Sequence, residues 1–263
     1  MTKTATSNSS TEQKSISQLL IDPVRHPLRA SVFASKLGRV AVAAPHPDDE
    51  SLGCGGLLAL LATAGQAADV LILTDGSRSH PDSRSYPAAQ LAALREQETL
   101  SALAALGLPS GAAHFLRFGD CALPKEGTSE FTGACRRLHK ILEDIAPDTL
   151  LVPWRRDPHC DHEATWRLLR GAAAQLASAP HWLEYPIWAW EHAAEDAAPR
   201  AGEAVAWRLD ISPVLARKQQ AIAQHRSQMG AIIRDDPTGF VLQPEMLRHF
   251  AHSWELYLEP GDV

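Results

Sequence analysis

The chain has 263 residues, of which 45% are hydrophobic and 21% charged, and this composition excludes collagen-like, coiled-coil and wholly disordered structures. Its 25 Lys and Arg are outnumbered by 31 Asp and Glu, and the net charge of −6 argues against a nucleic-acid-binding protein. No apolar run reaches the roughly 18 residues of a membrane span, so we expect a cytoplasmic protein with no membrane insertion.

The N-terminal segment is rich in Ser and Thr and has no apolar stretch of the kind found in signal peptides. We expect residues 1–20 to form a disordered tail. No later segment has the composition of a linker, so residues 21–263 are expected to form a single domain. The four cysteines show no C-x-x-C spacing, which predicts reduced thiols and neither a disulfide framework nor a zinc knuckle.

The first predicted elements form a strand–helix–strand unit. Val40–Ala44 is a short apolar run typical of a buried parallel strand, and a polar cluster follows it. Leucines at helical spacing then continue to Gly65, a suitable helix C-cap. Ala68–Thr74 has the pattern of a second buried strand. This order is typical of a parallel βαβ unit.

The same alternation continues along the chain. Helices are expected at Ala88–Leu106, Phe131–Ile145 and His162–Ala177, and strands at His114–Phe118 and Thr149–Pro153. After Pro180 we expect strands at Trp182–Trp190 and Val205–Ile211, a helix at Ser212–Ile233 and a terminal strand at Trp254–Leu258. The sequence therefore predicts an α/β fold, a Rossmann-like and mostly parallel sheet flanked by helices, with a small C-terminal extension that contains β-strands.

Two polar clusters follow predicted strands, at the edge of the sheet where functional loops gather. One runs from His46 to Glu50, and the other runs from His159 to His162. Imidazole and carboxylate ligands together are typical of zinc and other divalent metals, and a catalytic site also needs a base that does not bind the metal. Either cluster alone could instead cap a helix or form a surface turn. Two such clusters at equivalent strand ends favour a metal site.

The string Ala44–Glu50, with the glycines of Gly53–Gly56 after it, resembles the first motif of the PIG-L / LmbE-like zinc deacetylases. That family includes enzymes acting on N-acetylglucosaminyl conjugates. His159-x-Asp161-His162 resembles its second motif. Weaker similarities are found at Leu73–Gly76, Arg95-x-x-Glu98, Leu106-Gly107, Gly119-Asp120, Lys218-x-x-Ala221 and His225-x-Ser227-Gln228.

The resemblance implies that His46, Asp49 and His162 hold zinc, with iron or another divalent metal as the alternative in the cell. Asp48 would then be the general base that takes a proton from the attacking water. This assignment is reasonable because one of two adjacent carboxylates neutralises metal charge while the other stays available for proton transfer.

The resemblance also implies that His159 stabilises the oxyanion as a cation or protonates the leaving amine. Asp161 would orient His159 and raise its pKa, because a nearby carboxylate favours imidazolium. Glu50 is expected to support the ligands or to begin the helix.

Substrate contacts are implied at four further positions. Arg95 corresponds to a residue that reaches a sugar hydroxyl or a phosphate, although it could instead be a surface arginine paired with Glu98. Asp120 is a candidate acceptor for a sugar hydroxyl. His225 and Gln228 lie three residues apart and could line the cleft, with ordinary packing as the alternative.

The sequence departs from the family pattern after Gly76, where Ser77–Asp82 replaces a Glu and further glycines. We expect this loop to border the pocket and to affect substrate choice. The Trp-rich segment Trp182–Trp190 is a second candidate for specificity, although tryptophans are more often found in a core.

The predicted function is removal of the acetyl group from an N-acetylated amino sugar or glycoconjugate of the N-acetylglucosaminyl type, a small-molecule substrate. An amidase that cuts a larger amide and a non-catalytic sugar-binding module are the alternatives. A nucleotide-binding domain is disfavoured, because Leu58 stands where G-x-G-x-x-G needs its third glycine. Association into a homo-oligomer is left open.

Overall fold

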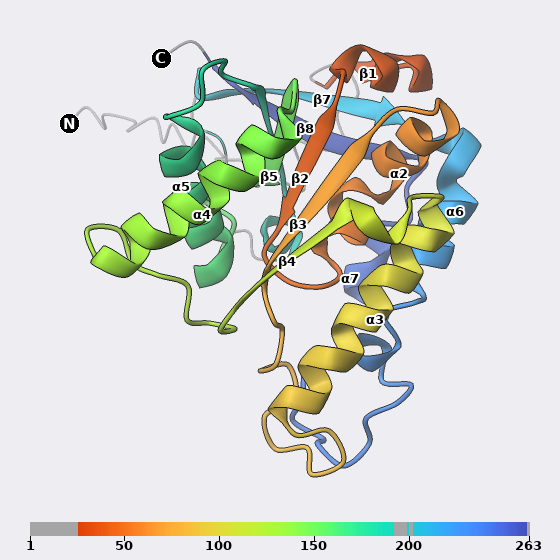
Figure 1. The fold of residues 1–263 in the computed structure, drawn as a ribbon. Coiled ribbons are helices and arrows are strands. Elements are labelled where there is room, and N and C mark those ends of the chain that lie inside the picture. Colours follow the sequence, from red (N-terminus) through yellow and green to blue (C-terminus); the bar gives the residue numbers. More distant parts are fainter. Residues whose placement is uncertain (1–25, 192–198, 200–201, 262–263) are drawn as a thin grey trace, which may run out of the picture.

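The computed structural model describes residues 26–191, 199 and 202–261, so the tail expected at residues 1–20 lies outside the described residues. Within the described part, strands assemble into one eight-stranded sheet (Figure 1). The strands are β1 (Leu28–Arg29), β2 (Val40–Ala44), β3 (Ala68–Thr74), β4 (Ala113–Phe118), β5 (Thr149–Pro153), β6 (His181–Tyr185), β7 (Ala204–Asp210) and β8 (Trp254–Pro260).

The strand order is β1-β7-β8-β6-β5-β2-β3-β4. The half of the sheet from β6 to β4 is parallel, and β2 at its centre pairs Val40 with Ala68 of β3 and with Thr149 of β5. β8 runs antiparallel to both β6 and β7. The predicted α/β fold with a mostly parallel sheet and a C-terminal β-containing extension is confirmed.

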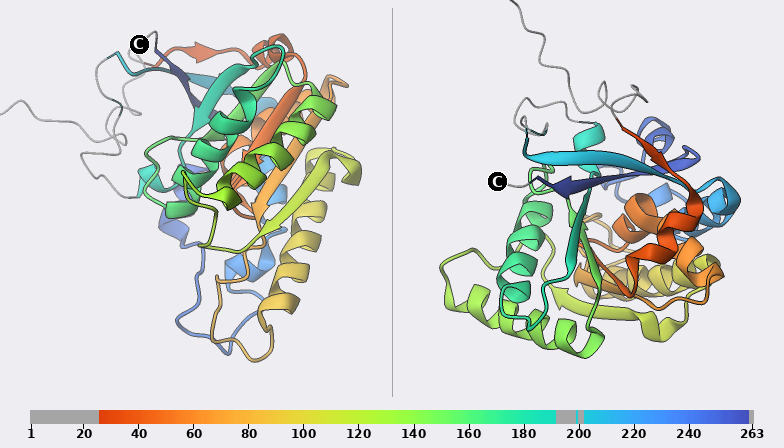
Figure 2. Two further views of the ribbon diagram at one scale, coloured as in Figure 1. Left: turned by 60° about the vertical axis from the view of Figure 1, so that its left-hand side comes forward. Right: turned by 90° about the horizontal axis from the view of Figure 1, so that it is seen from above.

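Helices cover both faces of the sheet (Figures 1 and 2). α2 (Asp49–Thr63), α3 (Ala88–Leu106) and α6 (Leu215–Ile222) lie on one face, and α4 (Ser129–Ile145) and α5 (Cys160–Ala173) lie on the other. A short helix, α7 (Pro244–His249), follows late in the chain. The described residues also form short 3-10 helices at Ser31–Leu37, Ser110–Ala112, Trp188–Trp190, Ser212–Val214 and Arg226–Met229.

Strand β2 is apolar at every position because it is buried on both faces. Val40, Val42 and Ala44 belong to the core beneath α2, whereas Ala41 and Ala43 belong to the core beneath α4 and α5. Such two-sided burial is the reason that central parallel strands show continuous apolar runs. The same burial holds β2 rigidly, and the polar loop that follows it is therefore well positioned.

The prediction of one continuous helix at Ser212–Ile233 is wrong, because this segment consists of a 3-10 turn, α6 and a second 3-10 turn. The backbone N–H of Ser227 donates to the Glu98 carboxylate at 2.7 Å instead of continuing a helix. Gly230 then adopts a positive φ of 66° and ends the segment.

The strand expected at Trp182–Trp190 ends early, at Tyr185. Pro186 follows directly, and it has no N–H to donate to a neighbouring strand. The chain then turns into the 3-10 helix that carries Trp188. Within the described ranges, no helix is both long enough and apolar enough to cross a membrane.

Candidate active site

A pocket of about 210 Å³, open at its mouth, lies where the loops after β2, β3, β4 and β5 meet. Its floor is polar and contains both clusters singled out from the sequence. Its lining includes His46, Asp48, Asp49, Arg78, Ser79, Arg95, Asp120, His159 and Gln228 together with the apolar side chains of Leu52, Ile187, Trp188, Phe240, Leu242 and Met246.

Three expected metal ligands converge at the N-terminus of α2. Asp49 Oδ2 lies 3.3 Å from His46 Nδ1 and 3.3 Å from His162 Nε2. Among the described residues, His162 Nε2 is buried without a hydrogen-bond partner. An unsatisfied buried nitrogen beside a carboxylate and a second imidazole fits a divalent metal, since all three are common zinc ligands.

The charge of Asp49 agrees with that interpretation. Burial alone would raise the pKa of Asp49, but His162 and His46 hold it well below its usual range. Burial lowers the pKa of His162, and Asp49 and Asp157 overcome this effect and raise it to about 9. The site therefore keeps Asp49 ionised, as a metal ligand must be.

Asp157 supports His162, and the sequence analysis missed this residue. Its Oδ2 lies 2.6 Å from His162 Nδ1, and its carboxylate accepts backbone N–H groups from Ile187, Trp188 and Ala189. A carboxylate on the second nitrogen of a ligating histidine fixes the tautomer and the ring orientation. Its only sequence signal is its position in the loop five residues before His162.

Asp161 supports His46, which differs from the expectation that it orients His159. Asp161 Oδ2 lies 3.1 Å from His46 Nε2 and accepts the backbone N–H of Cys121 at 2.8 Å. Asp120 Oδ1 lies 3.5 Å from the same nitrogen of His46. Burial lowers the pKa of His46, but the hydrogen bonds with Asp120, Asp161 and Asp49 outweigh it and raise the pKa well above 6.5.

His159 is held in a different way. Its Nδ1 accepts the backbone N–H of Asp161 at 3.2 Å, so the ring caps α5, and it stacks on Trp188 with 5.8 Å between centroids. Burial and the neighbouring His162 and His46 lower the pKa of His159 to about 4, although Asp161 raises it as expected. The ring is neutral at pH 7, and the capping bond assigns its proton to Nε2.

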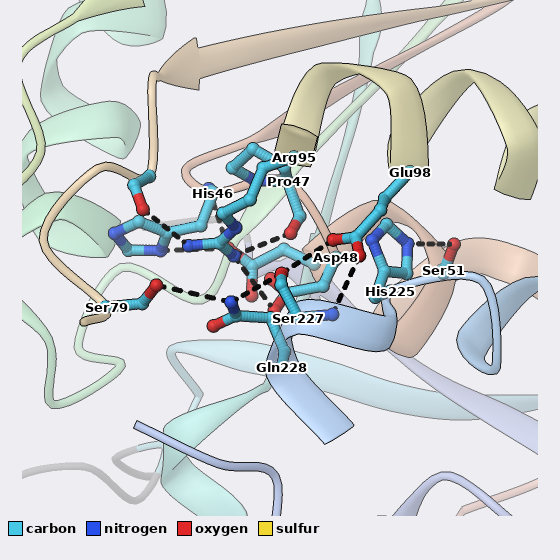
Figure 3. A network of polar contacts seen from close by, with 12 residues as sticks. His46, Pro47, Asp48, Ser51, Ser79, Arg95, Glu98, His225, Ser227 and Gln228 are labelled. Atoms are coloured by element: carbon cyan, nitrogen blue, oxygen red, sulfur yellow. Dashed lines mark hydrogen bonds and ion pairs between the residues drawn. The ribbon is translucent and has the colours of Figure 1, made fainter. Parts of the chain in front are cut away.

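Asp48 occupies the N-cap position of α2 with φ of 146°, a strained conformation for a residue with a side chain. Arg95 Nη2 donates to Asp48 Oδ2 at 3.1 Å (Figure 3). Burial raises the pKa of Asp48 to about 6 even though Arg95 opposes the shift. A carboxylate with this pKa can exchange a proton near neutral pH.

Arg95 is buried and holds the loops after β2 and β3, instead of lying on the surface. It is 3% exposed, and it donates to the carbonyl oxygens of Pro47 at 2.7 Å and Gly76 at 2.9 Å as well as to Asp48. The alternative pairing with Glu98 is wrong, because the Glu98 carboxylate accepts both the backbone N–H and the hydroxyl of Ser227.

His225 and Gln228 have different surroundings, although both were expected in the cleft. His225 is fully buried behind the site, where Nε2 lies 3.1 Å from Glu50 Oε1 and 3.2 Å from Ser51 Oγ (Figure 3). Glu50 also accepts the backbone N–H of Asp48. Gln228 does line the pocket, and its Nε2 donates to Ser79 Oγ at 3.2 Å.

The loop after β3 borders the pocket as expected, through Arg78 and Ser79. Asp120 faces the same space and accepts the backbone N–H of Arg78 at 2.8 Å. The Ser79 carbonyl accepts the backbone N–H of Phe240 at 2.6 Å, which joins this loop to the late segment carrying the apolar wall.

Trp188 is the tryptophan of the Trp182–Trp190 segment that lines the pocket. Its ring lies against His159 on one side and Phe240 on another, with 5.5 Å between the Trp188 and Phe240 centroids. Trp182 and Trp190 pack in the two cores. The segment therefore contributes both a cleft residue and core residues.

A model of the family described as "PIG-L: GlcNAc-PI de-N-acetylase" matches residues 41–173, more than half of the chain. The chain belongs to this PIG-L family. Both metal-site motifs fall inside the matched range, whereas the apolar wall from Ile187 to Met246 lies beyond it.

Relatives of this PIG-L family protein include known deacetylases. It is 28% identical over 193 residues to the diacetylchitobiose deacetylase of Thermococcus kodakarensis, covering 70% of this chain and 67% of that protein. The N,N'-diacetylchitobiose deacetylase structure from Pyrococcus horikoshii has a TM-score of 0.58 and 26% identity, covering 72% of this chain and 70% of that one. A conserved protein of Thermus thermophilus has a TM-score of 0.55 and 29% identity, covering 73% of this chain and 80% of that one.

Proposed function

We propose that this PIG-L family protein is a zinc-dependent deacetylase that removes the acetyl group from an N-acetylated amino sugar or its glycoconjugate. The observation that carries this proposal is the convergence of His46 and His162 on Asp49 Oδ2, at 3.3 Å each, beside a separate carboxylate, Asp48. A sugar-binding module has no use for this combination. The two diacetylchitobiose deacetylases support an acetylated amino sugar as substrate.

His46, Asp49 and His162 would hold the metal, which when bound polarises the amide carbonyl and makes water more acidic. Asp48 acts as the base: its carboxylate accepts the proton of the attacking water and then delivers it to the leaving amine. Arg95 and the backbone of the Asp48–Asp49 turn hold this carboxylate at the pocket floor. Its pKa of about 6 suits both directions of proton transfer.

His159 donates a hydrogen bond from Nε2 to the oxygen that becomes negative in the tetrahedral intermediate. A neutral imidazole can perform this role without a net charge, as long as the ring is held in place. The α5 cap and the Trp188 stack supply that restraint. Asp120, Arg78 and Gln228, which line the pocket, offer polar groups for the sugar hydroxyls.

The first test is acetate release from N-acetylglucosamine, its oligomers and its glycosides, with protein loaded with zinc, loaded with Fe(II), or stripped by a chelator. We expect release that depends on the metal, and loss of nearly all turnover in Asp48→Asn with metal content retained. Metal loss in Asp48→Asn at an unchanged circular dichroism spectrum would make Asp48 a ligand and overturn its role as base.

An amidase acting on a larger amide is the second candidate, because the apolar wall offers room beyond an acetyl group. Trp188, Phe240, Leu242 and Met246 line the pocket together. The same sugars carrying butanoyl or hexanoyl amides distinguish the candidates. Faster cleavage of hexanoyl than acetyl amides, lost in Met246→Ser, would favour the larger amide.

A further inference from the structure

Two exposed cysteines lie together, although they are far apart in the sequence, and one of them, Cys121, lines the pocket. Cys121 follows Asp120 in the loop after β4, and Cys160 is the first residue of α5. The thiol sulfurs of both and a carboxylate oxygen of Asp161 lie within 4.8 Å of one another. The other two cysteines, Cys54 and Cys135, are buried.

The spacing of these three donor atoms is close to that of a metal site. Zinc–sulfur bonds of about 2.3 Å in a tetrahedral site place two sulfurs roughly 3.8 Å apart. Cys160 Sγ lies 4.0 Å from Asp161 Oδ1, and every pair among the three donor atoms lies within 4.8 Å, which is at most about 1 Å beyond that spacing.

Asp161 divides its two oxygens between different neighbours. Oδ2 contacts His46 Nε2 and the backbone N–H of Cys121, while Oδ1 faces the Cys160 thiol. The backbone bond to Cys121 also fixes the loop that carries the second sulfur. Thiolate ligands select soft and borderline cations such as zinc and cadmium over magnesium or calcium.

We propose that Cys121, Cys160 and Asp161 form a second metal site, for a thiophilic divalent cation such as Zn²⁺ or Cd²⁺, separate from the His46–Asp49–His162 site. Binding forms two metal–sulfur bonds and one metal–oxygen bond, and the two thiol protons pass to solvent. Because both cysteines are exposed, water completes the coordination.

Asp161 connects the two sites, because it belongs to the second and contacts His46 of the first, so occupancy of one affects the other. A cation on Oδ1 withdraws negative charge from Oδ2, which weakens the hydrogen bond that supports His46. It also links the loop after β4 to α5. Excess thiophilic metal therefore inhibits the enzyme, whereas a stoichiometric amount does not.

The test compares metal binding by the full-length protein and by Cys121→Ser/Cys160→Ser, both kept reduced with a phosphine. Each is stripped of metal and titrated with Cd²⁺, while bound metal is counted after dialysis and the ultraviolet thiolate–metal charge-transfer band is recorded. We expect two ions for the wild type and one for the double variant, with the band present only in the wild type. Cys135→Ala is the matched control and keeps two ions.

A second readout is modification of the native protein by a thiol reagent, which is expected to label two cysteines without metal and none with two equivalents of Cd²⁺. The proposal is overturned if the double variant binds as many ions as the wild type, or if the wild type binds one ion without the band. It is also overturned if the reduced protein binds no second ion and air oxidation removes two hydrogens as a disulfide. Loss of the first ion with the thiolate band intact would instead count against the proposed deacetylase site.

Discussion

Arg95 and Asp48 form an ion pair inside the protein, with Arg95 Nη2 3.1 Å from Asp48 Oδ2 and with side chains only 3% and 7% exposed. Without this guanidinium, burial would raise the pKa of Asp48 further, because a buried carboxylate resists ionisation. Arg95 therefore adjusts the acidity of the proposed base and also anchors its loop.

The pH dependence of activity follows from this pair. Asp48 must be ionised to accept a proton, so kcat/KM is expected to fall as the pH drops through about 6. Arg95→Met removes the charge that lowers the pKa of Asp48. The acidic limb of the pH–activity profile is therefore expected to shift by about one unit toward higher pH. Arg117→Met, on an exposed arginine that pairs with Glu96, is the control and leaves the limb in place. An unshifted limb in Arg95→Met would show that another group controls it.

Metal affinity is expected to depend on Asp157, which never touches the metal in our proposal. Asp157→Asn weakens the hydrogen bond to His162 Nδ1, and losses of such partners reduce metal affinity by about 10–100-fold. Competition with a chromogenic chelator measures the dissociation constant. Asp144→Asn, on an exposed residue of α4, is the matched control. Equal affinities in the two variants would count against His162 as a ligand.

Gly76 is expected to tolerate no side chain. Its φ is 62°, and an added Cβ would lie 2.5 Å from Arg95 Nη1. Gly76→Ala should lower the free energy of unfolding by about 1–3 kcal/mol, and it should shift the acidic limb of activity in the same direction as Arg95→Met. Gly111→Ala has open space around the new Cβ and serves as the control. Denaturant unfolding and the pH profile together check this prediction.

A buried ion pair between α6 and β8 is expected to contribute strongly to stability. Lys218 Nζ lies 2.8 Å from Glu255 Oε1, and Glu255 also accepts the backbone N–H groups of Gly56 and Leu57 in α2. Lys218→Met leaves a buried carboxylate without its cation, which typically costs about 3–5 kcal/mol. Lys140→Met, at an exposed pair with Asp144, should cost less than about 1 kcal/mol. Urea unfolding midpoints compare the two.

The centre of the parallel half of the sheet could be predicted because β2, β3 and β5 are buried on both faces and appear as largely apolar runs. Val40–Ala44 and Thr149–Pro153 are the clearest examples, and each is followed by one of the polar clusters. The carboxyl ends of neighbouring parallel strands meet, so the juxtaposition of His46 and His162 followed from topology.

The supporting contacts could not be predicted in the same way, since they join side chains through tertiary packing. The Asp161 carboxylate reaches His46 although His159 is its neighbour in sequence. The Glu98 carboxylate interrupts the expected C-terminal helix by bonding the Ser227 backbone. Local periodicity carries no information about either contact, because the partners lie more than 100 residues apart.

Two stretches of the chain form the pocket, and each contributes a different kind of surface. The polar floor comes from loops within residues 41–173, and the apolar wall of Trp188, Phe240, Leu242 and Met246 comes from later sequence. These stretches meet through the bond between the Phe240 N–H and the Ser79 carbonyl. Trp188 also restrains His159, so Leu242 and Met246 are the wall residues whose mutation can change which molecule enters while the proposed catalytic residues stay in place.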